Sequence, residues 1–160
     1  MNCNCNAFED ILMKNFTIIV DTREQKPFLF KGIDPQPKII IKKLDTGDYS
    51  LEGYSDQICV ERKSVIDLFG SCGSGRERFQ REIERMGKFE YAAIVCEGDW
   101  QQILRSSQEY TMMLPKSIFA SIVAWEQRYN IYFWPCVNRK MAEKTTYRIL
   151  ERYYRDRSLI

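Results

Sequence analysis

The chain has 160 residues, and 44% of them are hydrophobic, which is enough for one domain with a substantial core. Because 24 Lys and Arg residues nearly balance 22 Asp and Glu residues, the net charge is only +2, and any surface that binds nucleic acid would have to be local. Histidine is absent, which excludes Ser-His-Asp and Cys-His catalysis and zinc sites that need imidazole. Hydrolytic chemistry would therefore depend on carboxylates, lysine and a hard metal ion.

The first half of the chain is predicted to be rich in strands. The apolar, β-branched run 16–21 indicates a buried strand, and the loop after it contains three prolines. Strands at 38–44, 49–51 and 57–63 are predicted to form an antiparallel meander, with a turn at 46–48.

Helices are predicted to dominate the second half. Ser64 is expected to cap a short helix over residues 65–69 that stops at Gly70, and residues 76–86 form an amphipathic helix. A strand, a short helix, a longer helix, a strand and a closing helix follow over residues 89–97, 99–104, 115–129, 131–135 and 140–155. This alternation predicts an α/β fold in which helices pack on parallel strands.

Cysteine spacing argues against a structural metal site. The six cysteines include no Cys-x-x-Cys pair, so a four-ligand zinc site is not expected. Cys59 and Cys96 lie in apolar runs and are predicted to be free core thiols. Cys3 and Cys5 lie in a polar leader, where a frayed terminus is a simpler interpretation than metal binding. Because the sequence shows no targeting signal and no membrane-length apolar run, a cytoplasmic or nuclear protein is expected.

Acidic residues cluster where predicted strands end. Asp21 and Glu24 follow the first strand, Asp48 lies in the turn, and Glu61 ends the strand at 57–63 together with Lys63. Because strand side chains alternate, Glu61 and Lys63 should share one face of the sheet. Two carboxylates that hold Mg²⁺, beside a lysine that orients water, form a centre able to hydrolyse phosphodiesters.

Each of these signals has an ordinary interpretation as well. Glu-x-Lys is common on solvated strand faces, and Gly-Asp is a frequent turn pair. The order of the two motifs, each preceded by an apolar strand in a chain without histidine, makes the catalytic and the ordinary interpretations about equally favoured.

The complete pattern resembles a known family. Gly47-Asp48, then Glu61-Arg62-Lys63, and then Asp67 after three further residues are similar to the G-D-Xn-E-R-K-X3-D signature of the XPF/MUS structure-specific endonucleases. The segment 20–24 resembles the first motif of that family, and residues 91–97 resemble its later buried strand ending in Glu-Gly. The resemblance covers about residues 16–154.

The resemblance implies a restriction-endonuclease-like fold, with a mixed β-sheet flanked by helices, that cuts branched or flapped DNA with Mg²⁺ or Mn²⁺. It implies that Asp48 and Glu61 are the principal metal ligands, with Asp21 as a further ligand. Lys63 would position the attacking water. The remaining motif residues would support the site: Glu24 close to the metal, Arg62 as a brace or phosphate contact, and Asp67 holding the loop geometry.

Two helices carry candidate binding surfaces. The helix at 76–86 presents arginines that are predicted to contact DNA phosphates together with Arg23, namely Arg76, Arg78, Arg81 and Arg85. The alternative is an exposed helix laced with salt bridges, and the flexible segment 71–75 before it favours DNA. The closing helix is a second DNA patch or a homodimer face built from Tyr147, Ile149, Leu150 and Tyr153, and the resemblance favours the dimer. Trp125 and Trp134 are expected in the core.

The expected organisation is a leader at 1–15 and a nuclease domain at 16–157, with no helix-hairpin-helix segment after Trp134. Substrate choice would then have to come from elsewhere. Two rival functions remain open at this point: a non-catalytic DNA-binding module that partners a catalytic subunit, and a restriction-type endonuclease acting on duplex DNA.

Overall fold

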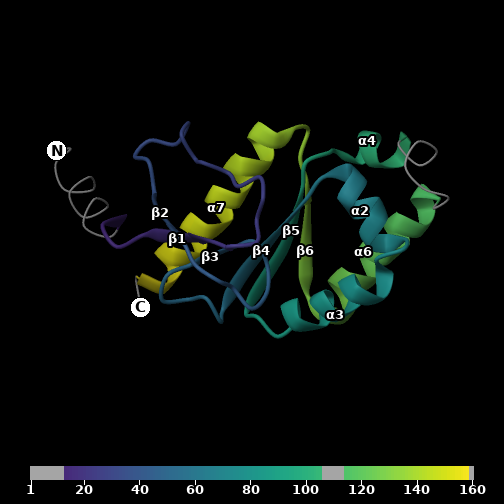
Figure 1. The fold of residues 1–160 in the computed structure, drawn as a ribbon, viewed down its shortest axis with the longest axis horizontal. Helices are drawn as coiled ribbons and strands as arrows, with labels where there is room; N and C mark the ends of the chain where they lie inside the picture. Colours follow the sequence, from purple (N-terminus) through teal and green to yellow (C-terminus); the bar gives the residue numbers. More distant parts are fainter. Residues whose placement is uncertain (1–12, 106–113, 159–160) are drawn as a thin grey trace.

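The structure, a computed structural model, describes residues 13–105 and 114–158. It has three layers: a twisted sheet lies between one long helix on one face and a group of helices on the other (Figure 1). The sheet has six strands in the order β2-β1-β3-β4-β5-β6. The strands are β1 (Thr17–Val20), β2 (Lys38–Ile41), β3 (Tyr49–Leu51), β4 (Ile58–Lys63), β5 (Tyr91–Cys96) and β6 (Ile131–Pro135).

Five helices flank this sheet within the described residues: α2 (Val65–Cys72), α3 (Arg76–Met86), α4 (Trp100–Arg105), α6 (Pro115–Tyr129) and α7 (Arg139–Ser158). The mixed sheet with helices on both faces confirms the predicted fold class. None of these helices is long and apolar enough to cross a membrane. Cys3 and Cys5, and most of the predicted leader, lie outside the described residues.

Side-chain alternation divides the core into two halves. On one face of the sheet, residues such as Val20, Tyr49 and Val60 pack against α7. On the other face, Cys59, Ala92 and Ile94 pack against α2, α3 and α6. Glu61 lies on the same side of β4 as Cys59, so the predicted catalytic carboxylate faces the α2 and α3 layer.

The strand pairing corrects one prediction. The three strands expected to form an antiparallel meander do not all pair, because β2 runs parallel to β1 at the edge of the sheet. The antiparallel neighbours are instead β1 with β3 and β3 with β4. The four residues of β1 are all buried, so this strand needs a neighbour on each side, and β2 supplies the second one. The strands β4, β5 and β6 are parallel, as predicted.

Two predictions about the helices need correction. Helix α2 continues through Gly70 to Cys72 and ends where the Gly73 N–H donates to the Phe69 carbonyl. Burial of Ser71 and Cys72 favours this extension of nearly one turn. Trp134 was expected in the core but is 44% exposed on the edge strand β6, whereas Trp125 is buried as expected. Cys59 and Cys96 are buried free thiols, which confirms the prediction.

Candidate active site

An open cleft of about 510 Å³ lies where β4 ends, between the turn before β3 and the helices α2 and α3. Most of the predicted site residues line it. The charged lining residues are Arg23, Glu24, Asp48, Glu61, Arg62, Lys63, Asp67 and Arg78.

Asp48 is held by the turn that precedes β3. Gly47 has φ +79°, and a Cβ there would lie 3.1 Å from the Cβ of Cys59, so this position requires glycine. The backbone N–H of Asp48 donates to the Val60 carbonyl at 2.9 Å, and its side-chain Oδ2 accepts from the Arg62 N–H at 2.8 Å. Among the described residues nothing donates to Oδ1, so that oxygen remains able to bind a ligand.

Glu61 and Lys63 project from the same face of β4, as alternation predicts. The Glu61 side chain is almost fully buried and forms an ion pair with the Lys63 ammonium. The ammonium also lies 4.5 Å from the centre of the Phe79 ring, which adds a cation–π contact from α3. Lys63 is therefore held by two independent contacts.

Ionisation of Asp48 and Glu61 at the same time is unfavourable in the metal-free protein. Burial raises the pKa of Asp48, and the Glu24 charge raises it further, although the Arg62 N–H opposes the shift. Burial likewise raises the pKa of Glu61, the Asp48 charge adds to this effect, and Lys63 opposes it. Two neighbouring acids that resist joint ionisation, and whose donors are hard oxygens, fit a divalent cation such as Mg²⁺.

The number of protein ligands is small. Among residues 13–105 and 114–158, no group of three or more acidic, cysteine or histidine side chains is placed to hold a metal ion. Mg²⁺ is commonly bound through one or two carboxylates, with water and phosphate oxygens completing its coordination. Asp48 and Glu61 fit that arrangement, which leaves the remaining positions to water and substrate.

Asp21 lies beside Asp48 in the backbone, but its carboxylate points elsewhere. The Asp21 N–H donates to the Asp48 carbonyl at 2.8 Å. Its carboxylate accepts hydrogen bonds from Arg23 and from the Leu44 N–H, and it is not part of the cleft lining. The structure thus brings Asp48, Glu61 and Lys63 together without the Asp21 carboxylate.

Arg62 points to the opposite face of β4, where it joins an ion-pair network. Its guanidinium donates to both oxygens of Glu24, at 2.9 Å and 3.1 Å, and to Glu97 at 3.1 Å. Glu97 in turn pairs with Arg139, the first residue of α7. Arg139 also donates to the carbonyls of Lys26 and Pro27. The connected charged side chains of Glu24, Arg62, Glu97 and Arg139 thus extend from the cleft to α7.

Asp67 closes the first turn of α2. The Ser64 hydroxyl accepts from the Asp67 N–H at 3.1 Å and donates to the Asp67 carboxylate at 2.7 Å. This reciprocal cap fixes the start of the helix at the cleft.

The predicted DNA-binding arginines of α3 are all exposed, and Arg78 lines the cleft. Arg85 donates to the Thr46 hydroxyl at 3.3 Å. Within the described part of the chain, no α3 arginine forms an ion pair, so DNA contact by these arginines stays a prediction.

Sequence reasoning missed Glu97 and Arg139. Glu97 follows the carboxyl end of β5, the parallel neighbour of β4, so the rule that ligands gather at the carboxyl ends of parallel strands could have placed it near the site. The next residue, Gly98, has no room for a side chain, because a Cβ there would lie 2.1 Å from Cγ2 of Val65 in α2. The position of Arg139 depends on how α7 docks, which no local pattern reveals.

The fold and the residues of the cleft agree with the comparisons with known proteins, which identify a domain family. The family model of the ERCC4 domain matches residues 20–149. Because this match covers most of the chain, the protein belongs to the ERCC4 domain family.

Curated relatives match over part of the chain. "DNA repair endonuclease XPF" from Cricetulus griseus is 46% identical over 65 residues, which cover 38% of this chain and 6% of that protein. "DNA repair endonuclease UVH1" from Arabidopsis thaliana is 42% identical over 79 residues, which cover 49% of this chain and 8% of that protein. The match thus spans less than a tenth of either relative.

Solved structures have the same fold. XPF from Aeropyrum pernix superposes with a TM-score of 0.64 and 25% identity, over 81% of this chain and 57% of that one. The same protein in complex with DNA gives a TM-score of 0.67 and 23% identity, over 88% of this chain and 66% of that one. These superpositions match the three-layer architecture seen here.

Proposed function

We propose that this protein is a divalent-metal-dependent DNA endonuclease that hydrolyses phosphodiester bonds. The observation that carries the proposal is the pair of carboxylates formed by half-buried Asp48 and buried Glu61, placed beside the Lys63 ammonium in an open cleft. The ERCC4 domain family and its named relatives, which are DNA repair endonucleases, support the choice of DNA as substrate.

The proposed chemistry divides the work among the cleft residues. Asp48 and Glu61 would hold Mg²⁺ or Mn²⁺, which when bound supplies Lewis-acid chemistry and lowers the pKa of water. Lys63 would donate from its ammonium to the attacking water or to a phosphate oxygen. Burial tends to lower the pKa of Lys63, but the Glu61 carboxylate raises it overall, so the lysine stays protonated and acts as a donor rather than a base.

Other residues would hold this centre in place. Arg62 donates its backbone N–H to Asp48 while Glu24 and Glu97 fix its guanidinium, so we assign it a bracing role. Asp67 keeps the start of α2 at the cleft. Arg23 and Arg78, at the cleft, and Arg76, Arg81 and Arg85, along exposed α3, would contact DNA phosphates.

We further propose branched, flapped or forked DNA as the preferred substrate, following the family. The test is a panel of labelled fork, flap and linear duplex DNA, incubated with Mg²⁺ or Mn²⁺. Cutting of the branched substrates with sparing of linear duplex is expected. Discrete products from linear duplex would favour a restriction-type enzyme, and tight binding without any cutting would favour a non-catalytic DNA-binding module.

The Asp48→Asn and Glu61→Gln variants test the ligand assignment. Each should fold and bind DNA but lose cleavage by at least about a hundredfold, because each removes one anionic ligand. The measurement is single-turnover cleavage together with circular dichroism of each variant. Normal cutting by either variant would show that the ligand assignment is wrong.

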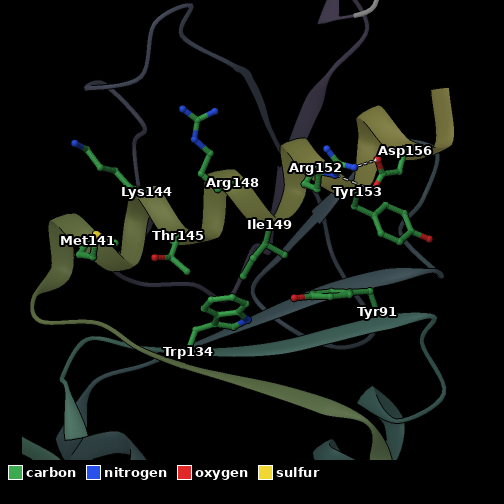
Figure 2. Close-up of a pocket in the computed structure, with 10 residues that line it drawn as sticks. All are labelled: Tyr91, Trp134, Met141, Lys144, Thr145, Arg148, Ile149, Arg152, Tyr153 and Asp156. Atoms are coloured by element: carbon green, nitrogen blue, oxygen red, sulfur yellow. Dashed lines mark hydrogen bonds and ion pairs between the residues drawn. The ribbon is translucent and has the colours of Figure 1, made fainter. Parts of the chain in front are cut away.

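We also propose a homodimer, but through a different surface from the one predicted. Tyr147, Leu150, Ile149 and Tyr153 are buried against the sheet, so they form the core rather than a free dimer face. The exposed apolar side chains near α7 are instead Tyr132, Trp134, Val137 and Met141. Figure 2 shows Trp134 and Tyr91 beneath α7, along a groove of about 580 Å³.

The edge strand β6 is closed to strand addition, which favours pairing through side chains. The Phe133 N–H donates to the Glu126 side chain at 3.2 Å, and Pro135 has no N–H to offer. A partner could therefore not extend the sheet at these positions. A second copy would bury the exposed aromatic and Met side chains instead, as the resemblance to a family that pairs through its late helices and strand implies.

A further inference from the structure

The hydrogen bonds between the Asp21 carboxylate and Arg23 are not explained by the proposed chemistry. The Asp21 Oδ1 accepts from the Arg23 backbone N–H at 2.9 Å and from its Nε at 2.7 Å, and Oδ2 accepts from its Nη2 at 3.3 Å. The Leu44 N–H donates to Oδ2 at 2.6 Å, and the Leu44 carbonyl accepts from Arg23 Nη2 at 2.8 Å. The carboxylate and one carbonyl thus fix one edge of the guanidinium.

The two side chains differ sharply in exposure. The Asp21 side chain is 1% exposed, whereas that of Arg23 is 63% exposed and lines the active-site cleft. Among the described residues, all four hydrogen bonds that the Asp21 carboxylate accepts come from Arg23 and Leu44, so its oxygens are already occupied away from Asp48 and Glu61. Long exposed arginines usually move freely, but this one is held at both Nε and Nη2.

The remaining part of the guanidinium lies at the cleft. Among the described residues, no hydrogen bond uses Arg23 Nη1. Arg23 lines the same cleft as Asp48 and Glu61, and the charges of Asp48 and Glu82 contribute to raising its pKa. A cation held rigidly at the edge of the cleft can bind a phosphate with little loss of side-chain entropy.

We propose that Asp21 is a positioning residue that acts through Arg23, and that the fixed Arg23 guanidinium clamps a DNA phosphate beside the cleft. Asp21 then binds no metal directly, contrary to the prediction from sequence. This inference rests on the proposed function for its ligand, DNA, but not on cleavage.

The Asp21→Asn variant tests the proposal through the direction in which its DNA affinity changes. Removing a negative charge close to bound DNA should, by simple electrostatics, tighten binding. Loss of the clamp predicts the opposite, namely DNA binding weaker by roughly ten- to a hundredfold, the effect of one charged hydrogen bond. The measurement is fluorescence anisotropy with a labelled fork in EDTA, so no metal and no cleavage is involved.

Asp45→Asn is the matched control, because Asp45 is exposed and adjoins Leu44 but does not hold Arg23. It should bind the fork as well as the wild-type protein or more tightly. If Asp21→Asn also binds as well as the wild type, the proposal is overturned. The double variant Asp21→Asn/Arg23→Gln should bind no more weakly than Arg23→Gln alone, because both changes remove the same contact; additive losses would contradict a shared role.

Arg23 variants keep the test decisive if Asp21→Asn is unstable. Arg23→Gln changes an exposed side chain and should lower the slope of log K against log salt by about one. Arg23→Lys should not restore binding, because lysine cannot form the same fork of hydrogen bonds. Binding of Arg23→Lys at the wild-type level would overturn the proposal.

Metal binding separates this inference from the proposed activity. Titration of metal-free protein with MnCl₂, followed by calorimetry, should give the same affinity for Asp21→Asn and the wild type, whereas Asp48→Asn should bind far more weakly. A tenfold or larger loss of Mn²⁺ affinity in Asp21→Asn would make Asp21 a ligand and refute the positioning role. If the wild type cuts no DNA but the binding results hold, only the proposed endonuclease activity fails.

Discussion

At the scale of single residues, neighbouring side chains fix both the position and the charge of the Lys63 ammonium. Glu61 and the Phe79 ring hold the ammonium from two directions, and the raised pKa keeps it charged. An arginine would keep the charge but would be too broad to occupy the same position between Glu61 and Phe79. The chemical contribution of Lys63 should therefore depend on shape as well as charge.

Replacement of Lys63 tests this dependence. Lys63→Arg should lower single-turnover cleavage by roughly a hundredfold, and Lys63→Met by up to about a thousandfold, the range for loss of one preorganised donor. Cleavage by Lys63→Arg at the wild-type rate would show that charge alone is sufficient. DNA binding in EDTA, measured in parallel, separates loss of chemistry from loss of substrate affinity.

The paired acids also predict a pH dependence of stability. The pKa values of Asp48 and Glu61 are raised in the folded protein. At pH values between the unfolded-state and the folded-state pKa values, the folded protein therefore binds more protons than the unfolded protein. The free energy of unfolding of metal-free protein should therefore fall as pH rises from about 5 to about 8. Asp21 and Glu24, whose pKa values are lowered, act only at more acidic pH.

Mg²⁺ should reverse this loss. Added MgCl₂ should raise the Tm strongly at about pH 8, where the acids must ionise, and only weakly at about pH 5. Differential scanning calorimetry at both pH values checks this expectation, with Asp48→Asn as the control that should respond little at either pH. An equal Mg²⁺ effect at both pH values would contradict the assignment of these acids.

At the scale of elements, the carboxyl end of β5 places helix α2 at the cleft. Gly98 lets Val65, at the start of α2, approach the backbone, and the same helix carries the capping Asp67. The close approach of strand and helix therefore positions part of the cleft wall.

Gly98→Ala should destabilise the fold by about 1–3 kcal/mol, because the added Cβ would lie 2.1 Å from Val65 and force α2 outwards. Gly32→Ala is the matched control: nothing lies within 4 Å of its Cβ position, so the change should stay within about 0.5 kcal/mol. Urea unfolding measures both. Equal stability of the two variants would mean that α2 adapts without cost.

Local sequence predicted the elements better than their partners. The boundaries of α3, α6 and β6 agree with the prediction because Gly75, Gly87, Pro115 and Pro135 mark the ends of these elements. The edge position of β2 and the exposure of Trp134 depend on contacts between distant segments, which a local pattern does not contain. The motif residues Asp48, Glu61 and Lys63 were located for the same local reason, whereas the turning of Asp21 towards Arg23 depends on the Leu44 backbone.

At the scale of the whole molecule, the groove between α7 and β6 tests the proposed homodimer. Trp134→Glu would place a charge in the exposed apolar surface and should convert a dimer to a monomer, as measured by analytical ultracentrifugation. Phe119→Glu is the control, since Phe119 is similarly exposed on α6, on the other face of the sheet. A wild-type protein that sediments as a monomer at all concentrations would exclude the homodimer.

The ion pairs from Glu24 through Arg62 and Glu97 to Arg139 have a thermodynamic consequence. They join the cleft to the first residue of α7, the helix that borders the proposed dimer groove. Suppose that subunit association shifts α7 and changes the ion pair between Arg139 and Glu97. Association would then change the affinity of the cleft for DNA, and DNA binding would change the association constant by the same factor. Subunit association and substrate recognition would then be linked equilibria.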